Sequence, residues 1–338
     1  MSLPTRSLAG REVSAIGLGC MNLSHAYGKP PTPEQGRALL HAALDAGVTL
    51  FDTAALYGFG SNESLVGPVL APHRRHILLC SKGGLTGQPV GPGGALQRVI
   101  DGRPASIRRD CEASLQRLGT DHIDLYYLHR WDKGVPIEES VGEMARLKAE
   151  GKIGALGLSE VSAGTLRRAQ AEHPIAAVQS EYSLWSRNVE LAVLQACGEL
   201  GVALVAFSPV ARGLLTAKPP EPASFEPKDI RRSMPRFEAP HYARNLQLAR
   251  RHAALAEQAG CSPAQLALAW LLHQAPQVLP IPGTTRAEHL QDDLSALTVQ
   301  LSSDLLQRLD ALWQPAAVSG PRYNEQNSRE VDTEEYAA

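Results

Sequence analysis

The sequence alternates between short apolar runs and longer segments with helical periodicity, and this alternation extends through most of the chain. The apolar runs are short and mostly continuous and do not alternate between polar and apolar residues, so we expect both faces of each predicted strand to be buried. About eight such runs occur, at residues 15–19, 48–51, 76–80, 123–128, 153–158, 177–179, 202–207 and 278–281. This pattern is typical of a closed parallel sheet surrounded by helices, and it predicts an α/β fold, a (β/α)8 TIM barrel.

Helical segments separate these runs, and several of them begin with recognisable start signals. Thr32 followed by Pro33 is one such signal, because Thr is a good N-cap and Pro suits the first helical position. An N-terminal β-hairpin is expected within residues 6–20, and a C-terminal helix and tail after the barrel. The predicted helices cover residues 32–46, 61–70, 104–118, 137–150, 162–171, 189–200, 242–259, 263–274 and 286–297.

An open, doubly wound sheet is the competing architecture. It would normally place a Gly-rich phosphate turn after the first strand. Here Gly17-Leu18-Gly19 is followed by Cys-Met-Asn, with no third glycine in register, which argues against that fold.

No linker is long and polar enough to divide the chain. We therefore expect a single domain over residues 1–338, with the barrel at about 6–312 and a tail at 313–338. The long polar segment 212–241 follows a predicted strand, so it is interpreted as an active-site loop. The polar, acidic segment 318–338 is expected to be mobile.

The composition excludes several classes of partner and site. The chain has 338 residues, of which 43% are hydrophobic and 20% charged, and its net charge of −2 gives no reason to expect nucleic acid or an anionic membrane as partner. The five cysteines are scattered without a CxxC pair, which argues against a zinc site or a disulfide framework. The first ten residues lack the apolar core of a signal peptide, and no run is long enough to span a membrane. We expect a cytoplasmic protein.

Four polar residues follow consecutive predicted strands, where the active site of such a barrel lies. Asp52 ends the second strand and Tyr57 lies on the loop after it, while Lys82 and His129 follow the third and fourth strands. Each has an ordinary explanation by itself, since Lys82 fits a solvated loop and His129 a hydrogen-bonded boundary position. Their shared location at one mouth of the barrel favours a site.

These four side chains suit the transfer of a proton to an oxygen atom. The ammonium group of Lys82 is expected to lower the pKa of Tyr57, and Asp52 to fix the position of Lys82. His129 can donate a hydrogen bond to a substrate oxygen. The set contains no nucleophile–base pair for acyl transfer and no cluster of metal ligands, so a hydride would have to come from a cofactor.

Several longer motifs surround these residues: residues 47–57, 81–82, 118–125 with His129, 157–159, 179–183, 207–209 and 281–286. With them the chain resembles the aldo-keto reductase superfamily from about residue 6 to residue 312. Residues 231–232 and 234–237 are most similar to the branch with perakine-reductase-like and auxin-induced-type members. The resemblance implies that Tyr57 is the general acid/base, that Lys82 and Asp52 tune it, and that His129 orients the carbonyl.

The resemblance also implies NADPH as the cofactor. Ser159 and Gln179 would hold the nicotinamide carboxamide, and Phe207 would stack on the ring, although Phe207 also fits a buried strand position. Glu160 stands where many relatives have Asn. Arg286 lies at a helix start and would bind the 2′-phosphate, with a plain surface residue as the alternative. The other implied cofactor contacts are Gly19, Cys20, Met21, Asp52, Ser208, Pro209, Gly213, Leu215, Gly283, Thr284, Thr285, Asp292 and Asp293.

The sequence therefore predicts an NADPH-dependent oxidoreductase that reduces aldehyde or ketone carbonyls of a small-molecule substrate. The alternative is a cofactor-binding regulatory subunit with slow turnover, a role in which similar folds serve potassium channels. Met21, Trp131, Trp185 and the segment 212–241 are candidates for the wall of the substrate pocket. An apolar, partly aromatic wall would suit aryl or other hydrophobic aldehydes and ketones.

Overall fold

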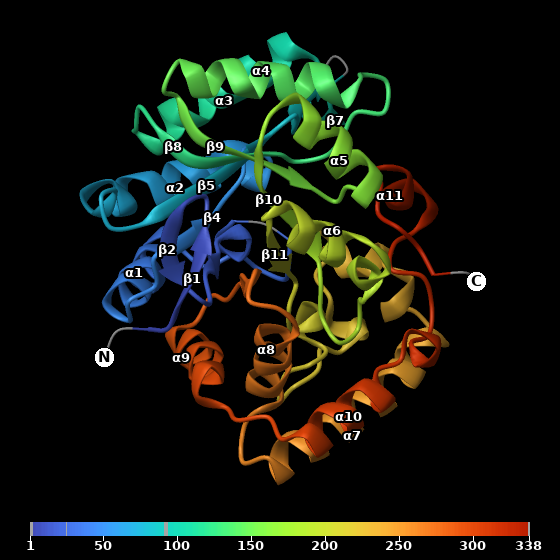
Figure 1. Cartoon of the computed structure of the whole chain (residues 1–338). Coiled ribbons are helices and arrows are strands. Elements are labelled where there is room, and N and C mark those ends of the chain that lie inside the picture. Colours follow the sequence, from blue (N-terminus) through green and yellow to red (C-terminus); the bar gives the residue numbers. More distant parts are fainter. Residues whose placement is uncertain (1–2, 25, 91–93, 337–338) are drawn as a thin grey trace.

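The computed structural model describes residues 3–24, 26–90 and 94–336. Its described part contains the predicted hairpin, β1 (Thr5–Leu8) paired antiparallel with β2 (Arg11–Ser14). Eight parallel strands follow in one sheet, and helices surround it (Figure 1), so the predicted (β/α)8 TIM-barrel fold is confirmed. In chain order these strands are β3 (Leu18–Gly19), β4 (Leu50–Asp52), β5 (Leu78–Gly83), β8 (Ile123–Leu128), β9 (Ile153–Ser159), β10 (Ile175–Glu181), β11 (Ala203–Phe207) and β12 (Val278–Pro280).

The sheet closes between its first and last strands. The backbone N–H of Gly17 donates to the carbonyl of Pro280 at 3.0 Å, and that of Gly19 donates to the carbonyl of Pro282 at 3.0 Å. A Cβ atom on Gly19 would lie 2.8 Å from the carbonyl oxygen of Ile281. The seam therefore needs glycine at position 19, because a side chain there would push the two strands apart.

Most helices lie outside the barrel and pack their apolar faces on its strands. The first begins with the predicted cap, since Thr32 and Gln35 form a reciprocal capping box. A second apolar cluster, which includes Leu50, Leu125 and Val205, fills the barrel interior. The described helices are α1 (Pro33–Asp45), α2 (Ser61–Leu70), α3 (Pro104–Leu118), α4 (Ile137–Ala149), α5 (Ala163–Glu172), α6 (Val193–Leu200), α7 (His241–Gln258), α8 (Pro263–Gln274), α9 (Ala287–Ser295), α10 (Ser303–Leu312) and α11 (Glu325–Arg329).

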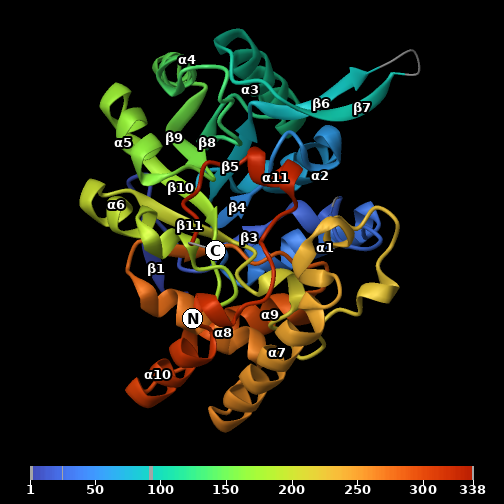
Figure 2. The same cartoon turned by 90° about the vertical axis from the view of Figure 1, so that its right-hand side faces the viewer.

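Two features differ from the sequence-based expectation. An antiparallel hairpin of β6 (Leu85–Val90) and β7 (Ala95–Ile100) projects from the barrel after β5 (Figure 2), where no strand was predicted. The segment 318–338 was expected to be mobile, and its last two residues lie outside the described ranges. Residues 318–336 are instead docked with α11 over the strand ends (Figure 2), because their polar side chains find partners there. Figure 1 places the two chain ends on opposite sides of the molecule. None of the described helices has the length and apolar character that a membrane crossing requires.

Candidate active site

A cavity of about 580 Å³ opens at the carboxyl ends of the barrel strands. Its wall combines strand ends, the loop after β11, the segment 230–234 and part of the tail after α10. It brings together most of the residues that the sequence singled out. Those that line it are Gly19, Met21, Asp52, Tyr57, His129, Ser159, Gln179, Phe207, Ser208, Pro209, Gly213, Gly283, Thr284 and Thr285.

Asp52, Tyr57 and Lys82 form a buried group that we call the strand-end cluster. Asp52 is the last residue of β4 and Lys82 lies near the end of β5, which pairs with β4, so the sheet itself brings the two side chains together. Lys82 is fully buried and forms an ion pair with Asp52. Its ammonium group also donates to the carbonyl of Thr53 at 2.9 Å and to Tyr57 Oη at 3.1 Å. Lys82 is thus fixed between a carboxylate and a phenol.

Two further residues complete the surroundings of Tyr57. Gln179, on β10, donates from Nε2 to Asp52 Oδ2 at 2.8 Å, which leaves that carboxylate held from two sides. The ring of His129, which follows β8, stands edge-on to the ring of Tyr57, with 5.9 Å between centroids and 84° between planes. His129 and Tyr57 therefore share one wall of the cavity.

The pKa of Tyr57 differs in direction from the sequence-based expectation. Burial raises it, the charge of Lys82 opposes that rise, and Asp52 adds to it; the net pKa is raised. The lowering by Lys82 that the sequence predicts is present, but burial outweighs it. The sequence does not reveal how completely the phenol is desolvated. Burial alone would lower the pKa of Lys82, but Asp52 and Tyr57 outweigh it and raise that pKa. At neutral pH the cluster therefore holds a neutral phenol beside an ammonium–carboxylate pair.

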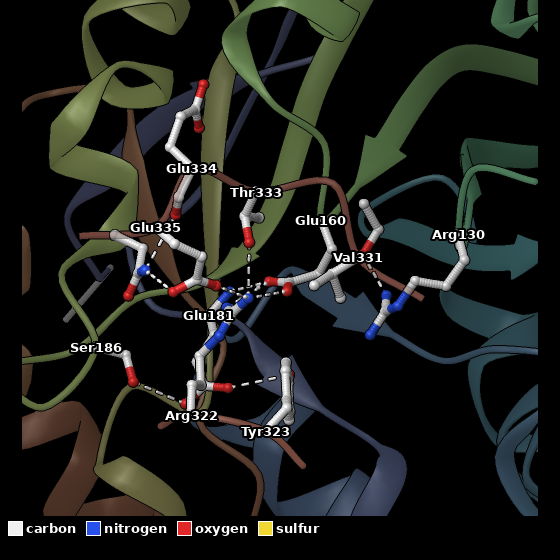
Figure 3. A network of polar contacts seen from close by, with 12 residues as sticks. Arg130, Glu160, Glu181, Ser186, Arg322, Tyr323, Val331, Thr333, Glu334 and Glu335 are labelled. Carbon is white, nitrogen blue, oxygen red and sulfur yellow. Dashed lines mark hydrogen bonds and ion pairs between the residues drawn. The ribbon is translucent and has the colours of Figure 1, made fainter. Parts of the chain in front are cut away.

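A second buried group of charges lies at the same end of the barrel and involves the tail; we call Glu160, Glu181, Arg212 and Arg322 the tail cluster. Figure 3 shows Glu160, Glu181 and Arg322 of this cluster. Arg322 lies 2.8 Å from Glu160, and Arg212 lies 2.6 Å from Glu181. Tyr323 also donates to Glu181, at 3.1 Å. Burial would raise the pKa of Glu181, but the two arginines outweigh it and lower that pKa to about 2. The cluster joins the ends of β9 and β10 to the loop after β11 and to the tail.

Several residues around the cavity have backbone conformations that side chains rarely adopt. Glu160, Ser208, Ala211 and Arg212 all have φ between +51° and +55°. Such strain costs free energy and persists where surrounding contacts impose it, often at functional sites. Glu160 is held by its pair with Arg322, and Arg212 by its pair with Glu181.

Some predicted site residues lie apart from the cavity. Cys20 and Leu215 are packed in the core and do not line it. Arg286 is exposed at the N-cap position of α9, and Asp292 accepts hydrogen bonds from Ser262 and Gln265. Asp293 is buried, and burial together with the charge of Asp292 raises its pKa to about 8.

The candidates for the pocket wall divide in the same way. Met21 and part of the segment 212–241 line the cavity. Trp185 is buried in the core, and Trp131 packs against the core with its indole N–H bonded to the carbonyl of Val135, so neither tryptophan is part of the wall.

Sequence reasoning missed several residues of the wall. Arg130 could have been predicted as a wall residue, because it directly follows His129 at a strand end. Arg98 lies on the unpredicted β7, and the tail residues Tyr323 and Val331 carry no local motif. Only the folded chain brings these last three residues to the cavity.

The wall near β11 and β12 has the chemistry of a site for a phosphate-containing cofactor. Ser208, Thr284 and Thr285 supply hydroxyl groups, and Gly213 has a φ of +95°, which lets the backbone turn without a side chain in the cavity. Phe207 contributes an aromatic face at the end of β11. An arginine, Arg231, also lines this region. The residues present therefore fit a nicotinamide dinucleotide.

Comparison with known proteins gives a consistent result. A profile of the Aldo/keto reductase family matches residues 15–314. The glycerol dehydrogenase AKR11B4 from Gluconobacter oxydans is 30% identical, with a TM-score of 0.83 over 93% of this chain and 97% of that one. The holo form of the aldo-keto reductase AKR11C1 from Bacillus halodurans is 26% identical, with a TM-score of 0.75 over 96% and 99% of the two chains. The thermostable aldo-keto reductase Tm1743, in complex with the inhibitor epalrestat, is 29% identical, with a TM-score of 0.72 over 92% and 100%.

Proposed function

This chain belongs to the aldo/keto reductase family, and we propose that it is an NADPH-dependent enzyme that reduces aldehyde or ketone carbonyls to alcohols. The family and the similar solved structures make it a carbonyl oxidoreductase with a nicotinamide cofactor. The observation that carries the proposal is the position of buried Lys82 between Asp52 and Tyr57 at the cavity wall.

Some residues of this chain would bind the cofactor, and others would transfer the proton. Ser159 and Gln179 would hold the nicotinamide end, Phe207 would stack on its ring, and the loop 208–213 would cover the pyrophosphate. The bound cofactor would supply the hydride that reaches the carbonyl carbon.

Tyr57 would donate its proton to the carbonyl oxygen. The raised pKa of Tyr57 keeps the phenol protonated at neutral pH, as a general acid requires. Once the proton has left, the ammonium of Lys82 at 3.1 Å stabilises the phenolate, and Asp52 keeps that ammonium in place. His129, edge-on to Tyr57, would donate a hydrogen bond to the same carbonyl oxygen.

Replacing the proton donor tests this proposal most directly. Tyr57→Phe should lower kcat for the reduction of 4-nitrobenzaldehyde by about 10³-fold or more, within reach of the effect of losing a general acid. NADPH should still bind, because the substitution removes one oxygen atom and no proposed cofactor contact. The two measurements are the fall in NADPH absorbance during turnover and the change in protein fluorescence on NADPH binding.

Tyr126→Phe is the matched control. Tyr126 is a fully buried tyrosine on β8 whose hydroxyl has no hydrogen-bond partner among the described residues, so losing it should leave turnover close to that of the wild type. Full activity of the Tyr57→Phe variant would refute the proposed acid. Tight NADPH binding by a wild-type protein that turns over no aldehyde would instead favour the regulatory subunit.

The choice of NADPH over NADH rests on Arg286. Its exposed guanidinium at the start of α9, after the last barrel strand, is suited to the 2′-phosphate that only NADPH carries. Arg286→Ala should raise the KM for NADPH by about tenfold, the loss of one charge-assisted contact, and leave the KM for NADH nearly unchanged. Equal use of the two cofactors by the wild type would remove this role from Arg286 and leave the carbonyl chemistry intact.

A further inference from the structure

Four arginines line the cavity, and three of them have a carboxylate partner. Arg98 pairs with Glu330, Arg212 with Glu181 at 2.6 Å, and Arg231 with Asp229 at 2.7 Å. The fourth is Arg130, for which no carboxylate lies at ion-pair distance within the described ranges. Asp52 is the carboxylate of the wall, and Lys82 already compensates it. Among the described arginines of the cavity wall, Arg130 is therefore the one without a carboxylate partner.

The guanidinium of Arg130 is held beside the proposed reaction centre. Its Nη1 donates to the carbonyl of His129 at 2.6 Å and to Ser159 Oγ at 3.1 Å. These neutral partners orient the group and leave its charge without a counterion. Figure 3 shows the side chain extending from the end of β8 toward the tail at Val331. An arginine has more N–H donors than these two contacts use, so a ligand can still be bound.

The positive charge of Arg130 also affects the pKa of Tyr57, the proposed proton donor. Burial raises the pKa of Tyr57, and the charge of Arg130 is among those that oppose the rise. Arg130 and Tyr57 both line the cavity. A negative group bound by Arg130 would be held within the same cavity as the carbonyl that Tyr57 protonates.

The strand order separates Arg130 from the phosphates of the cofactor. Arg286 and the threonines 284 and 285 follow β12, whereas Arg130 follows β8. In the closed sheet β9, β10 and β11 lie between these strands on one side, and β5, β4 and β3 on the other. Arg130 and the two threonines thus lie on opposite sides of the mouth. A single dinucleotide would lie with its nicotinamide end at Ser159 and its adenosine end at Arg286. Its phosphate groups would then not occupy the guanidinium of Arg130, which could bind the substrate.

We propose that Arg130 binds an anionic group of the substrate, so that the enzyme prefers aldehydes or ketones that carry a carboxylate or a phosphate. This inference rests on the proposed function, because it assigns the substrate class of the same site. It adds an anionic group to the aryl or other hydrophobic aldehydes and ketones that the sequence predicts. A planar guanidinium recognises a carboxylate or a phosphate through paired, charge-assisted hydrogen bonds.

The test compares substrates that differ in charge. The probes are 4-formylbenzoate, 4-formylphenyl phosphate and the neutral methyl 4-formylbenzoate, each reduced at saturating NADPH. The wild type should show a kcat/KM at least tenfold higher for one of the anions than for the ester. Arg130→Met should reduce this preference by about 10- to 100-fold, mainly through KM, because it removes a charge-assisted contact. Arg130→Lys should retain part of it, as the charge remains.

Arg98→Met is the matched control, since Arg98 lines the same cavity but is already paired with Glu330. It should leave the ratio of anion to ester within about threefold, a change that corresponds to less than one charge-assisted contact. A wild type that prefers the ester, or an Arg130→Met variant that loses anion and ester activity equally, would overturn the inference. Reduction of none of the three aldehydes would instead count against the proposed function. The two anions separate a carboxylate site from a phosphate site.

Discussion

The strand-end cluster and the tail cluster are both buried groups of charges at the same mouth, but the chain builds them in different ways. In the strand-end cluster, Lys82 reaches partners 25 and 30 residues away, on neighbouring β-strands or the turn after them. In the tail cluster, Arg322 reaches Glu160 across 162 residues. The barrel register fixes the first, whereas the pair of Arg322 with Glu160 in the second forms only once a late segment docks. We infer that substitutions in the strand-end cluster change the chemical step, whereas substitutions in the tail cluster change the cavity wall.

The largest effect is expected when the strand-end pair is broken. Lys82→Met would leave Asp52 buried without its cation, which should lower the free energy of unfolding by about 3 to 5 kcal/mol. It would also remove the charge beside Tyr57 and lower kcat by about 10³-fold. Denaturant unfolding and steady-state kinetics measure the two effects.

The double variant Asp52→Asn/Lys82→Met makes this prediction sharper. Removing both charges should recover much of the stability, because no unpaired buried charge remains, but it should recover no activity. A double variant that regained turnover would show that the pair serves only the fold.

Breaking the tail cluster should have a different result. Arg322→Met would leave Glu160 without the partner at 2.8 Å, whereas Glu181 would keep Arg212. We expect a loss of about 3 kcal/mol in the free energy of unfolding, faster proteolysis of the tail, and a higher substrate KM. The value of kcat should change much less than in Lys82→Met, because the strand-end cluster is intact.

Arg329→Met provides the control for the tail. Arg329 belongs to the same segment, but its pair with Glu325 is exposed, and such pairs contribute little. Its unfolding, proteolysis and KM should match the wild type. If Arg322→Met lowered kcat as strongly as Lys82→Met, the separation between chemistry and wall would be wrong.

The difference between contacts set by neighbouring strands and contacts made by a distant segment explains which residues the sequence could predict. Continuous apolar runs indicate buried parallel strands, and their ends place Asp52, Lys82 and His129 around one mouth before any contact is known. The partners of Arg322 cannot be read in this way, because no local pattern specifies a pair 162 residues apart. The hairpin of β6 and β7 was missed although Gly and Pro residues between its strands are a turn signal.

The net direction of the pKa shift of Tyr57 was not predicted for a related reason. Sequence reasoning identified its charged neighbour, Lys82, but the extent of burial follows from the whole fold. The roles assigned to these residues remain predictions that the substitutions above address.

Asp293 and Glu181 are both buried carboxylates, but their surroundings differ. Glu181 has two arginines beside it, whereas Asp293 has no cation partner among the described residues. Burial and the charge of Asp292 raise the pKa of Asp293 from 3.8 to about 8. A raised folded-state pKa means that the native protein binds the proton more tightly than the unfolded chain. Its contribution to stability is therefore fully present below about pH 4 and is lost as the pH rises toward about 8.

Asp293→Asn should remove this pH dependence. At pH 8 the variant should be more stable than the wild type by about 1 to 2 kcal/mol, of the order of the cost of an unsatisfied buried polar group. The measurement is the free energy of unfolding in denaturant at pH 5 and pH 8. Asp292→Asn is the comparison: Asp292 is only partly buried and accepts bonds from Ser262 and Gln265, so its loss should destabilise the protein at pH 5. Because the variant also removes a charge that raises the pKa of Asp293, its stability should fall less between pH 5 and pH 8 than that of the wild type. Parallel curves for wild type and Asp293→Asn would mean that the proton uptake of Asp293 does not change on unfolding between pH 5 and pH 8, and would contradict the raised pKa.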